Sequence, residues 1–127
     1  MLRFVYYYLR SMRLYYGFVT GTTTLFGALV SGRTLAEGRT WLLFAMGFLA
    51  WGFNQIFSDW CDRREDAVNA PHRPMVTGAL RPMPAFAVSS VGLAAIAIVG
   101  YWLSPYTLLF LGVGGALNIA YSILKRV

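Results

Sequence analysis

The sequence contains few acidic residues and almost no cysteine. Only five of its 127 residues are Asp or Glu, and Cys61 is the single cysteine. One cysteine excludes an internal disulfide and a metal site built from several cysteines. Charged residues make up 13% of the chain, whereas 57% is hydrophobic and 17% is aromatic. This composition is typical of an integral membrane protein and excludes an ordinary soluble globular domain.

The basic residues outnumber the acids and give a formal net charge of +6. They lie beside apolar segments and form no stripe on a soluble face, so they indicate membrane topology and no nucleic-acid partner. Nine of the eleven Lys and Arg residues lie near the two ends of the chain or between residues 62 and 84, and the other two are Arg33 and Arg39. The positive-inside rule therefore predicts a multi-pass protein with both termini in the cytoplasm.

The apolar stretches predict an all-α integral membrane bundle of four transmembrane helices, which forms a single domain over residues 1–127. A helix that crosses a bilayer needs roughly 20 predominantly apolar residues. The predicted spans cover residues 14–30, 40–60, 85–103 and 105–124. The arginines and aromatic residues of the range 1–13 predict an amphipathic segment that lies at the membrane interface. Residues 62–84 predict a cytoplasmic loop, because its four prolines prevent one continuous helix.

Four of the five acids lie within eight residues at the end of the second predicted span. They are Asp59, Asp62, Glu65 and Asp66. If the span continues as a helix through Asp66, positions 54, 58, 62 and 66 follow one another at four-residue intervals and share a face. Like charges on one face repel, so we expect a cation among them.

Carboxylate oxygens without a cluster of His or Cys select a hard cation, and Mg²⁺ is held in this way together with substrate phosphates. Arg73 and Arg81 in the following loop suit bidentate phosphate contacts. The pattern therefore predicts a diphosphate site with Mg²⁺ at the cytoplasmic mouth of the membrane bundle. The alternative is a solvated cluster in which acids and arginines at a helix end pair with one another.

The acidic stretch resembles the first aspartate-rich motif of the UbiA family of intramembrane prenyltransferases, including its chlorophyll-synthase-like members. The family pattern is approximately N-D-x-x-D-x-x-x-D, followed by N-x-P-x-R-P-x-x-x-G, and this chain has SDWCDRRED followed by AVNAPHRPMVTG. Where the pattern begins with Asn the chain has Ser58, and Asn54 lies one helical turn earlier. Near the end of the chain, YSILK resembles the family's YxxxK element. The resemblance covers the chain from about the first predicted span to the last residue, as the N-terminal four-helix half of the family fold.

The resemblance implies Mg²⁺-dependent transfer of a prenyl group from an isoprenyl diphosphate to an acceptor. It implies that Asp62 and Asp66 bind the metal, directly or through water, with Asp59 supporting them. It also implies catalytic roles for Asp62, Asp66 and Tyr121. It also implies that Asn54, Arg73 and Lys125 contact the substrate, while the membrane lipid surrounds the helices.

The family has a second aspartate-rich motif, whereas no Asp or Glu follows Asp66 in this sequence. We therefore expect no transferase activity from residues 1–127 alone, with the second motif supplied by another membrane chain or by the missing C-terminal half. The alternative is a non-catalytic accessory subunit of a larger membrane complex, derived from a truncated prenyltransferase.

Overall fold

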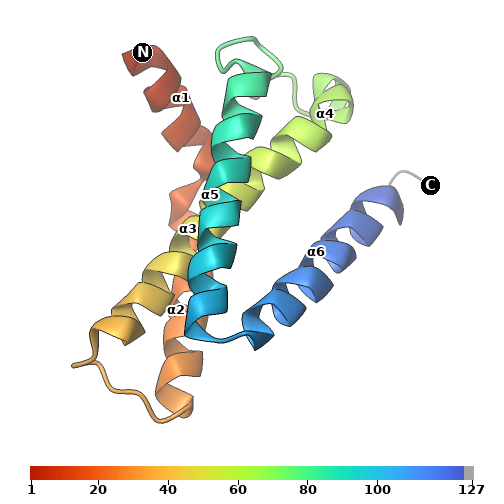
Figure 1. The fold of residues 1–127 in the computed structure, drawn as a ribbon. Coiled ribbons are helices and arrows are strands. Elements are labelled where there is room, and N and C mark those ends of the chain that lie inside the picture. The colour runs from red at the N-terminus through yellow and green to blue at the C-terminus, as the bar shows by residue number, and fades with distance from the viewer. Residues whose placement is uncertain (125–127) are drawn as a thin grey trace. The chain divides into compact units, whose positions relative to one another are not determined.

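The computed structural model describes residues 1–124 and, within the last helix, only part of the side chains. All regular structure in these described residues is helical (Figure 1), which confirms the predicted all-α class. The helices are α1 (Leu2–Met12), α2 (Leu14–Val30), α3 (Gly38–Cys61), α4 (Arg63–Asn69), α5 (Pro82–Leu103) and α6 (Tyr106–Leu124). Their contacts divide the chain into two compact units, Met1–Leu93 and Ala94–Val127.

The helices α2, α3 and α5 cover the predicted spans 14–30, 40–60 and 85–103, and α6 covers all but the first residue of the predicted span 105–124. Among the described residues, α3 and α5 are long and apolar enough to cross a membrane, whereas α2 has only 17 residues. A membrane-spanning role for α2 and α6 therefore stays a prediction. The structure differs from the expected loop 62–84 at both ends, because α4 occupies part of it and α5 already begins at Pro82. Proline is compatible with the first turn of a helix, where the backbone N–H groups have no intrahelical acceptor.

The first half of α3 packs closely on α2 through residues with small side chains. A Cβ atom added at Gly47 would lie 2.9 Å from the carbonyl oxygen of Thr20. The hydroxyl of Thr20 donates to the carbonyl oxygen of Gly47 at 2.8 Å, and that of Thr24 donates to the carbonyl oxygen of Leu43 at 3.0 Å. Small residues and hydroxyl bonds of this kind let two helix backbones approach each other in an apolar environment.

The second half of α3 packs on α1, the loop after α4 and the first part of α5. These elements share a buried hydrophobic core of Tyr8, Met12, Ile56, Met75, Leu80 and Ala85. Across this core the hydroxyl groups of Tyr8 and Ser89 form a buried hydrogen bond of 2.7 Å. The core fixes α1 and the loop beside the end of α3 that carries the acids.

Arg13 separates α1 from α2 and has a left-handed backbone conformation, with φ 48° and ψ 49°. It is the one residue other than glycine with a positive φ in the part of the chain that the structure describes. This conformation costs an L-residue about 1 kcal/mol or more. The bend directs the Arg13 side chain toward α3, as the site described below shows.

The second unit contains the end of α5, a tight turn and α6. The backbone N–H of Ser104 donates to the carbonyl oxygen of Gly100 at 2.9 Å and ends α5. On α6, Leu109, Val113, Leu117 and Tyr121 follow at four-residue intervals, and each is more than half exposed. Residues at this spacing share one face of a helix, so α6 presents an apolar strip.

Candidate functional site

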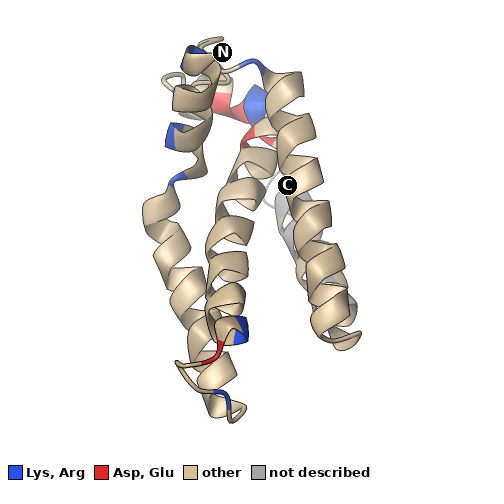
Figure 2. Cartoon of the chain, turned by 60° about the vertical axis from the view of Figure 1, so that its left-hand side comes forward, with Lys and Arg blue, Asp and Glu red and all other residues tan. Residues whose placement is uncertain are grey.

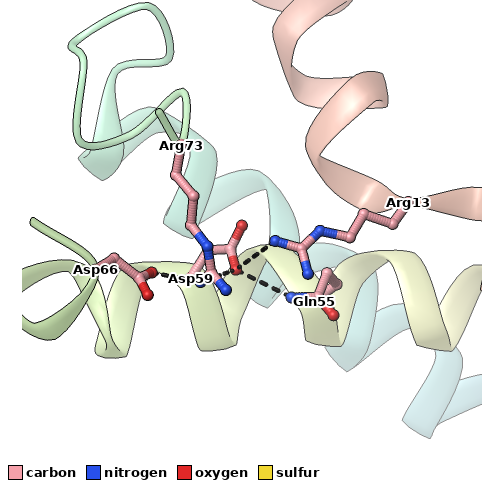
Figure 3. Close-up of polar contacts among 5 residues, drawn as sticks. All are labelled: Arg13, Gln55, Asp59, Asp66 and Arg73. Atoms are coloured by element: carbon pink, nitrogen blue, oxygen red, sulfur yellow. Dashed lines mark hydrogen bonds and ion pairs between the residues drawn. The ribbon is translucent and has the colours of Figure 1, made fainter. Parts of the chain in front are cut away.

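Charged residues of the Met1–Leu93 unit gather near the two ends of α3, with uncharged helix between them (Figure 2). At the C-terminal end of α3, Asp59 accepts hydrogen bonds from Gln55 Nε2 and Arg73 Nη1, each at 3.0 Å to Oδ1 (Figure 3). Arg13 Nη2 lies 3.7 Å from the same oxygen. Residues 13, 55 and 73 come from different segments, so the packing of α1, α3 and the loop builds this arrangement.

Arg73 also bonds to Asp66 on α4, and one guanidinium nitrogen therefore bridges both carboxylates. The side chains of Asp59 and Asp66 are only 4% and 10% exposed, and that of Arg73 is 24% exposed. A buried carboxylate is costly unless a charge partner and hydrogen bonds compensate it. We name Asp59, Asp66, Arg13 and Arg73 the ion cluster.

The helix through the acids is interrupted at Asp62, so the condition of one continuous helix through Asp66, on which the shared face of positions 54, 58, 62 and 66 depends, is not met. Asp62 has φ −87° and ψ 1° and separates α3 from α4. Its N–H still donates to the carbonyl oxygen of Ser58, and the N–H of Asp66 donates to that of Asp62, both at 2.9 Å. The structure therefore retains the hydrogen-bond register of a helix but changes the backbone torsions at the central acid.

The other predicted site residues lie in different surroundings. Asn54 and Asp62 are half-buried, and Gln55 is the amide side chain that bonds to Asp59. Tyr121 is an exposed residue of the second unit, and Lys125 lies outside the described residues. In the sequence, Arg13 indicates only membrane topology and Gln55 has no predicted role, although Gln55 precedes Asp59 by one helical turn.

The carboxylates have the hard oxygen donors that Mg²⁺ prefers. In the described residues, however, no three His, Cys, Asp or Glu side chains are grouped so that they could hold a metal ion. Arg73 provides the positive charge between Asp59 and Asp66 in this arrangement. The donor chemistry thus fits a divalent cation, while the observed geometry is that of an acid pair compensated by arginine.

A cavity of about 760 Å³ adjoins the ion cluster within the Met1–Leu93 unit. Its polar lining comes from the end of α1, the bend, α3 and the loop after α4, and includes Arg10, Ser11, Arg13, Asp59, His72 and Arg73. Ligand pockets commonly have volumes of about 300–1,000 Å³. The cavity therefore has the size and the charged groups needed to bind an anionic head group.

The sequence model of the UbiA prenyltransferase family matches residues 20–127. The chain is 31% identical over 77 residues to the bacteriochlorophyll synthase 33 kDa chain of Rhodobacter capsulatus, covering 61% of this chain and 25% of that protein. It is 36% identical over 86 residues to the digeranylgeranylglyceryl phosphate synthase of Natronomonas pharaonis, covering 68% of this chain and 31% of that protein.

A further relative is the digeranylgeranylglyceryl phosphate synthase of Methanothrix thermoacetophila, which is 38% identical over 68 residues. This alignment covers 53% of the present chain and 26% of that protein. The chain thus spans about a quarter to a third of the length of these curated relatives. No solved structure matches the chain.

Proposed function

Since the chain belongs to the UbiA prenyltransferase family, whose members are integral membrane proteins, we propose that it takes part in prenyl transfer from an isoprenyl diphosphate to an acceptor. The observation that carries this proposal is the ion cluster beside a polar cavity at the end of an apolar helix. The relatives are named as synthases of bacteriochlorophyll and of digeranylgeranylglyceryl phosphate. Both names are compatible with an isoprenoid substrate for this chain.

In the proposed reaction the bond between C1 of the prenyl group and the diphosphate oxygen breaks, and its electron pair leaves with the diphosphate. The resulting allylic cation is attacked by a nucleophilic atom of the acceptor, which then loses a proton. Arg73 and Lys125 contact the leaving diphosphate, and Asn54 orients it. The role proposed for Tyr121, to donate to the diphosphate, rests on the family resemblance of YSILK alone. Fixed positive groups aimed at developing negative charge stabilise such a transition state.

The family prenyltransferases use Mg²⁺, and Asp62 and Asp66, supported by Asp59, would hold it here. When bound, this cation supplies charge neutralisation of the diphosphate. Arg73 Nη1 bonds to one oxygen of Asp59 and one of Asp66, and moving Arg73 onto phosphate oxygens would leave these two oxygens for the cation. We therefore expect metal binding and diphosphate binding to favour each other, with Arg73 exchanging the carboxylates for phosphate oxygens.

Residues 1–127 contain one acidic motif and no acid beyond Asp66, so we expect them to bind diphosphate without catalysing turnover. The remaining carboxylates would come from another membrane chain or from the C-terminal part of a full-length protein. The test incubates the purified, folded chain with Mg²⁺ and isoprenyl diphosphates of several lengths. Robust product formation by the isolated chain would contradict this expectation.

The sharper test replaces Asp62 by Asn and measures Mg²⁺-dependent diphosphate binding by calorimetry. We expect binding to be lost, because one fewer carboxylate remains for the cation. Glu37→Gln is the matched control, since it removes an acid at the opposite end of α3.

The four-span topology with cytoplasmic termini is tested separately by labelling exposed positions. In a Cys61→Ser background, Leu35→Cys should react with an impermeant maleimide outside intact cells, and Val68→Cys only after permeabilisation.

One observation favours a second candidate function, that of a non-catalytic subunit of a membrane complex. Arg73 already compensates both buried acids, which is the arrangement expected of a purely structural cluster. Unchanged diphosphate binding in Asp62→Asn, together with purification of the chain as part of a larger membrane complex, would favour this second function.

A further inference from the structure

A second, smaller pocket of about 280 Å³ lies where the beginning of α1 meets the residues that lead into α5. It is lined by Arg3 and Phe4 of α1 and by Gly78, Ala79 and Arg81. Of these, only Ala79 also lines the cavity beside the ion cluster. The reaction proposed above assigns no role to this pocket, and its charged groups therefore need an explanation of their own.

The two arginines bring positive charge to one pocket without an acid to compensate it. Among the described residues, neither Arg3 nor Arg81 forms an ion pair with a carboxylate. The guanidinium group of Arg3 lies 5.8 Å from the centre of the Tyr7 ring, and Arg81 is exposed. Because like charges repel, an anion between the two guanidinium groups would be favourable.

The places of both arginines at helix ends point to the same ligand charge. Arg3 lies in the first turn of α1, and Arg81 directly precedes α5. Neither helix has an acidic residue in its first turn. The N-terminal end of a helix carries a partial positive charge, so a basic residue there is unfavourable and a bound anion is favourable. Both helix ends therefore add to the preference of this pocket for an anion.

The exposed side of α1 indicates that the anion belongs to a membrane lipid. Leu2, Val5 and Leu9 are all exposed, and their spacing places them on one face of α1. A neighbouring face carries Tyr8 and Met12, which are buried in the core. A helix that packs on the protein and still exposes an apolar strip together with arginines is typical of the membrane interface.

The predicted topology and the charge of the pocket select one class of lipid. The start of the chain and residues 62–84 are predicted to face the cytoplasm, where anionic phospholipids give the membrane a negative surface potential. A zwitterionic head group would bring its own cation close to the two arginines, whereas an anionic head group would not. The volume of 280 Å³ is at the lower end for ligand pockets and suits a head group without its acyl chains.

We propose that Arg3 and Arg81 bind the head group of an anionic phospholipid of the bilayer, whose acyl chains lie along the exposed apolar strip of α1. The lipid holds the start of α1 against the start of α5. It thereby supports the buried hydrogen bond between Tyr8 and Ser89, which joins the same two helices. This lipid is a structural ligand and no substrate, and its site requires neither Mg²⁺ nor prenyl transfer.

The test adds phosphatidylglycerol or phosphatidylcholine to the purified chain in a neutral detergent and measures the retained lipid by native mass spectrometry and the Tm. We expect phosphatidylglycerol to bind more tightly and to raise the Tm. Arg3→Gln and Arg81→Gln should each weaken its binding about 5-fold, and the double variant about 30-fold. Arg64→Gln removes the same charge at an exposed position outside the pocket and should bind like the unmodified chain.

A charge reversal separates loss of lipid binding from loss of structure. Arg3→Glu puts an acid into the pocket that Arg81 also lines, so the chain itself supplies the missing negative charge. We expect this variant to lose its preference for phosphatidylglycerol and to have a higher Tm than the unmodified chain in phosphatidylcholine. A lower Tm in phosphatidylcholine would contradict an uncompensated positive charge in this pocket.

Equal retention of the two lipids by the unmodified chain would overturn the site, as would equal phosphatidylglycerol affinity of the double variant and Arg64→Gln. Displacement of phosphatidylglycerol by geranyl diphosphate would also overturn it, because the pocket would then take a prenyl donor. Asp62→Asn distinguishes this site from the proposed function. It should leave phosphatidylglycerol retention unchanged whether or not it abolishes Mg²⁺-dependent diphosphate binding, and a loss of lipid retention in this variant would contradict a separate site.

Discussion

The two halves of α3 are held in different ways. The first half packs on α2 by close contact of small residues, and Thr20 and Thr24 bond to its backbone carbonyls. The second half is held by long side chains, including Arg13 and Arg73, which reach the buried Asp59 from other segments. The contact between α2 and the first half of α3 is close and involves no charged side chain. The ion pairs of Asp59 with Arg13 and Arg73 instead lie beside the cavity. The candidate site lies at the second half, where the cavity adjoins these ion pairs.

The largest expected effect comes from removing the arginine that compensates the acids. Arg73→Met leaves Asp59 and Asp66 buried without their main partner, so we expect a loss of about 3 kcal/mol in the free energy of unfolding. Thermal unfolding in detergent measures it, with the exposed Arg64→Gln as control. Adding Asp59→Asn and Asp66→Asn to Arg73→Met should restore much of the loss. Equal Tm values for Arg73→Met and the unmodified chain would show that the cluster is not required for stability.

The first half of α3 is tested by adding a methyl group at its closest approach to α2. In Gly47→Ala the new Cβ would lie 2.5 Å from Thr24 Oγ1 and 2.9 Å from the backbone oxygen of Thr20. The helices must separate, which should cost about 1–3 kcal/mol. Gly27→Ala is the control, since open space surrounds Gly27 on α2 and alanine favours helix there by about 0.5–1 kcal/mol. A Tm of Gly47→Ala at or above that of Gly27→Ala would refute the close-packing account.

The hydrogen bond that joins α1 to α5 should contribute less. Tyr8→Phe leaves the buried hydroxyl of Ser89 without this partner, and we expect a loss of about 1 kcal/mol. Burial raises the pKa of the Tyr8 phenol, although its bond to Ser89 opposes the shift. A raised pKa means that the stability advantage over Tyr8→Phe is full below about pH 10, the value of an exposed tyrosine. It should disappear as the pH rises through the Tyr8 pKa.

Tyr6→Phe, at an exposed position of α1, is the control for Tyr8→Phe. The comparison fails if the two variants unfold at the same temperature throughout this pH range.

The smallest effect is expected at the exposed end of α3. The Thr34 N–H donates to Glu37 Oε1 at 2.8 Å, and Arg33 forms an ion pair with Glu37 at 3.1 Å. These contacts, the Thr34 N–H first, lower the pKa of the Glu37 carboxyl. Glu37→Gln should therefore lower the Tm only slightly at neutral pH, and the difference should vanish as the pH falls through the lowered pKa. A drop as large as that of Arg73→Met would mean that the two ends of α3 are held alike.

The helices and the acidic motif could be predicted from the sequence, because both depend on residues close together in the chain. Apolar runs gave the ranges of α2, α3, α5 and α6, and the spacing of Asp59, Asp62 and Asp66 indicated a shared helix face. The end of α3 at Cys61 lies within one residue of the predicted end of the second span, whereas the short helix α4 and the start of α5 at Pro82 were not predicted, since helix ends are the least sharply defined part of such patterns.

Sequence alone determined the all-helical class, the membrane composition and the resemblance to the prenyltransferase family. Only the tertiary structure decided that Arg73 bridges Asp59 and Asp66, that Arg13 approaches Asp59, and that a cavity opens beside them. Helix periodicity is a property of neighbouring residues. The partner of a buried charge instead depends on which distant segments the hydrophobic core brings together.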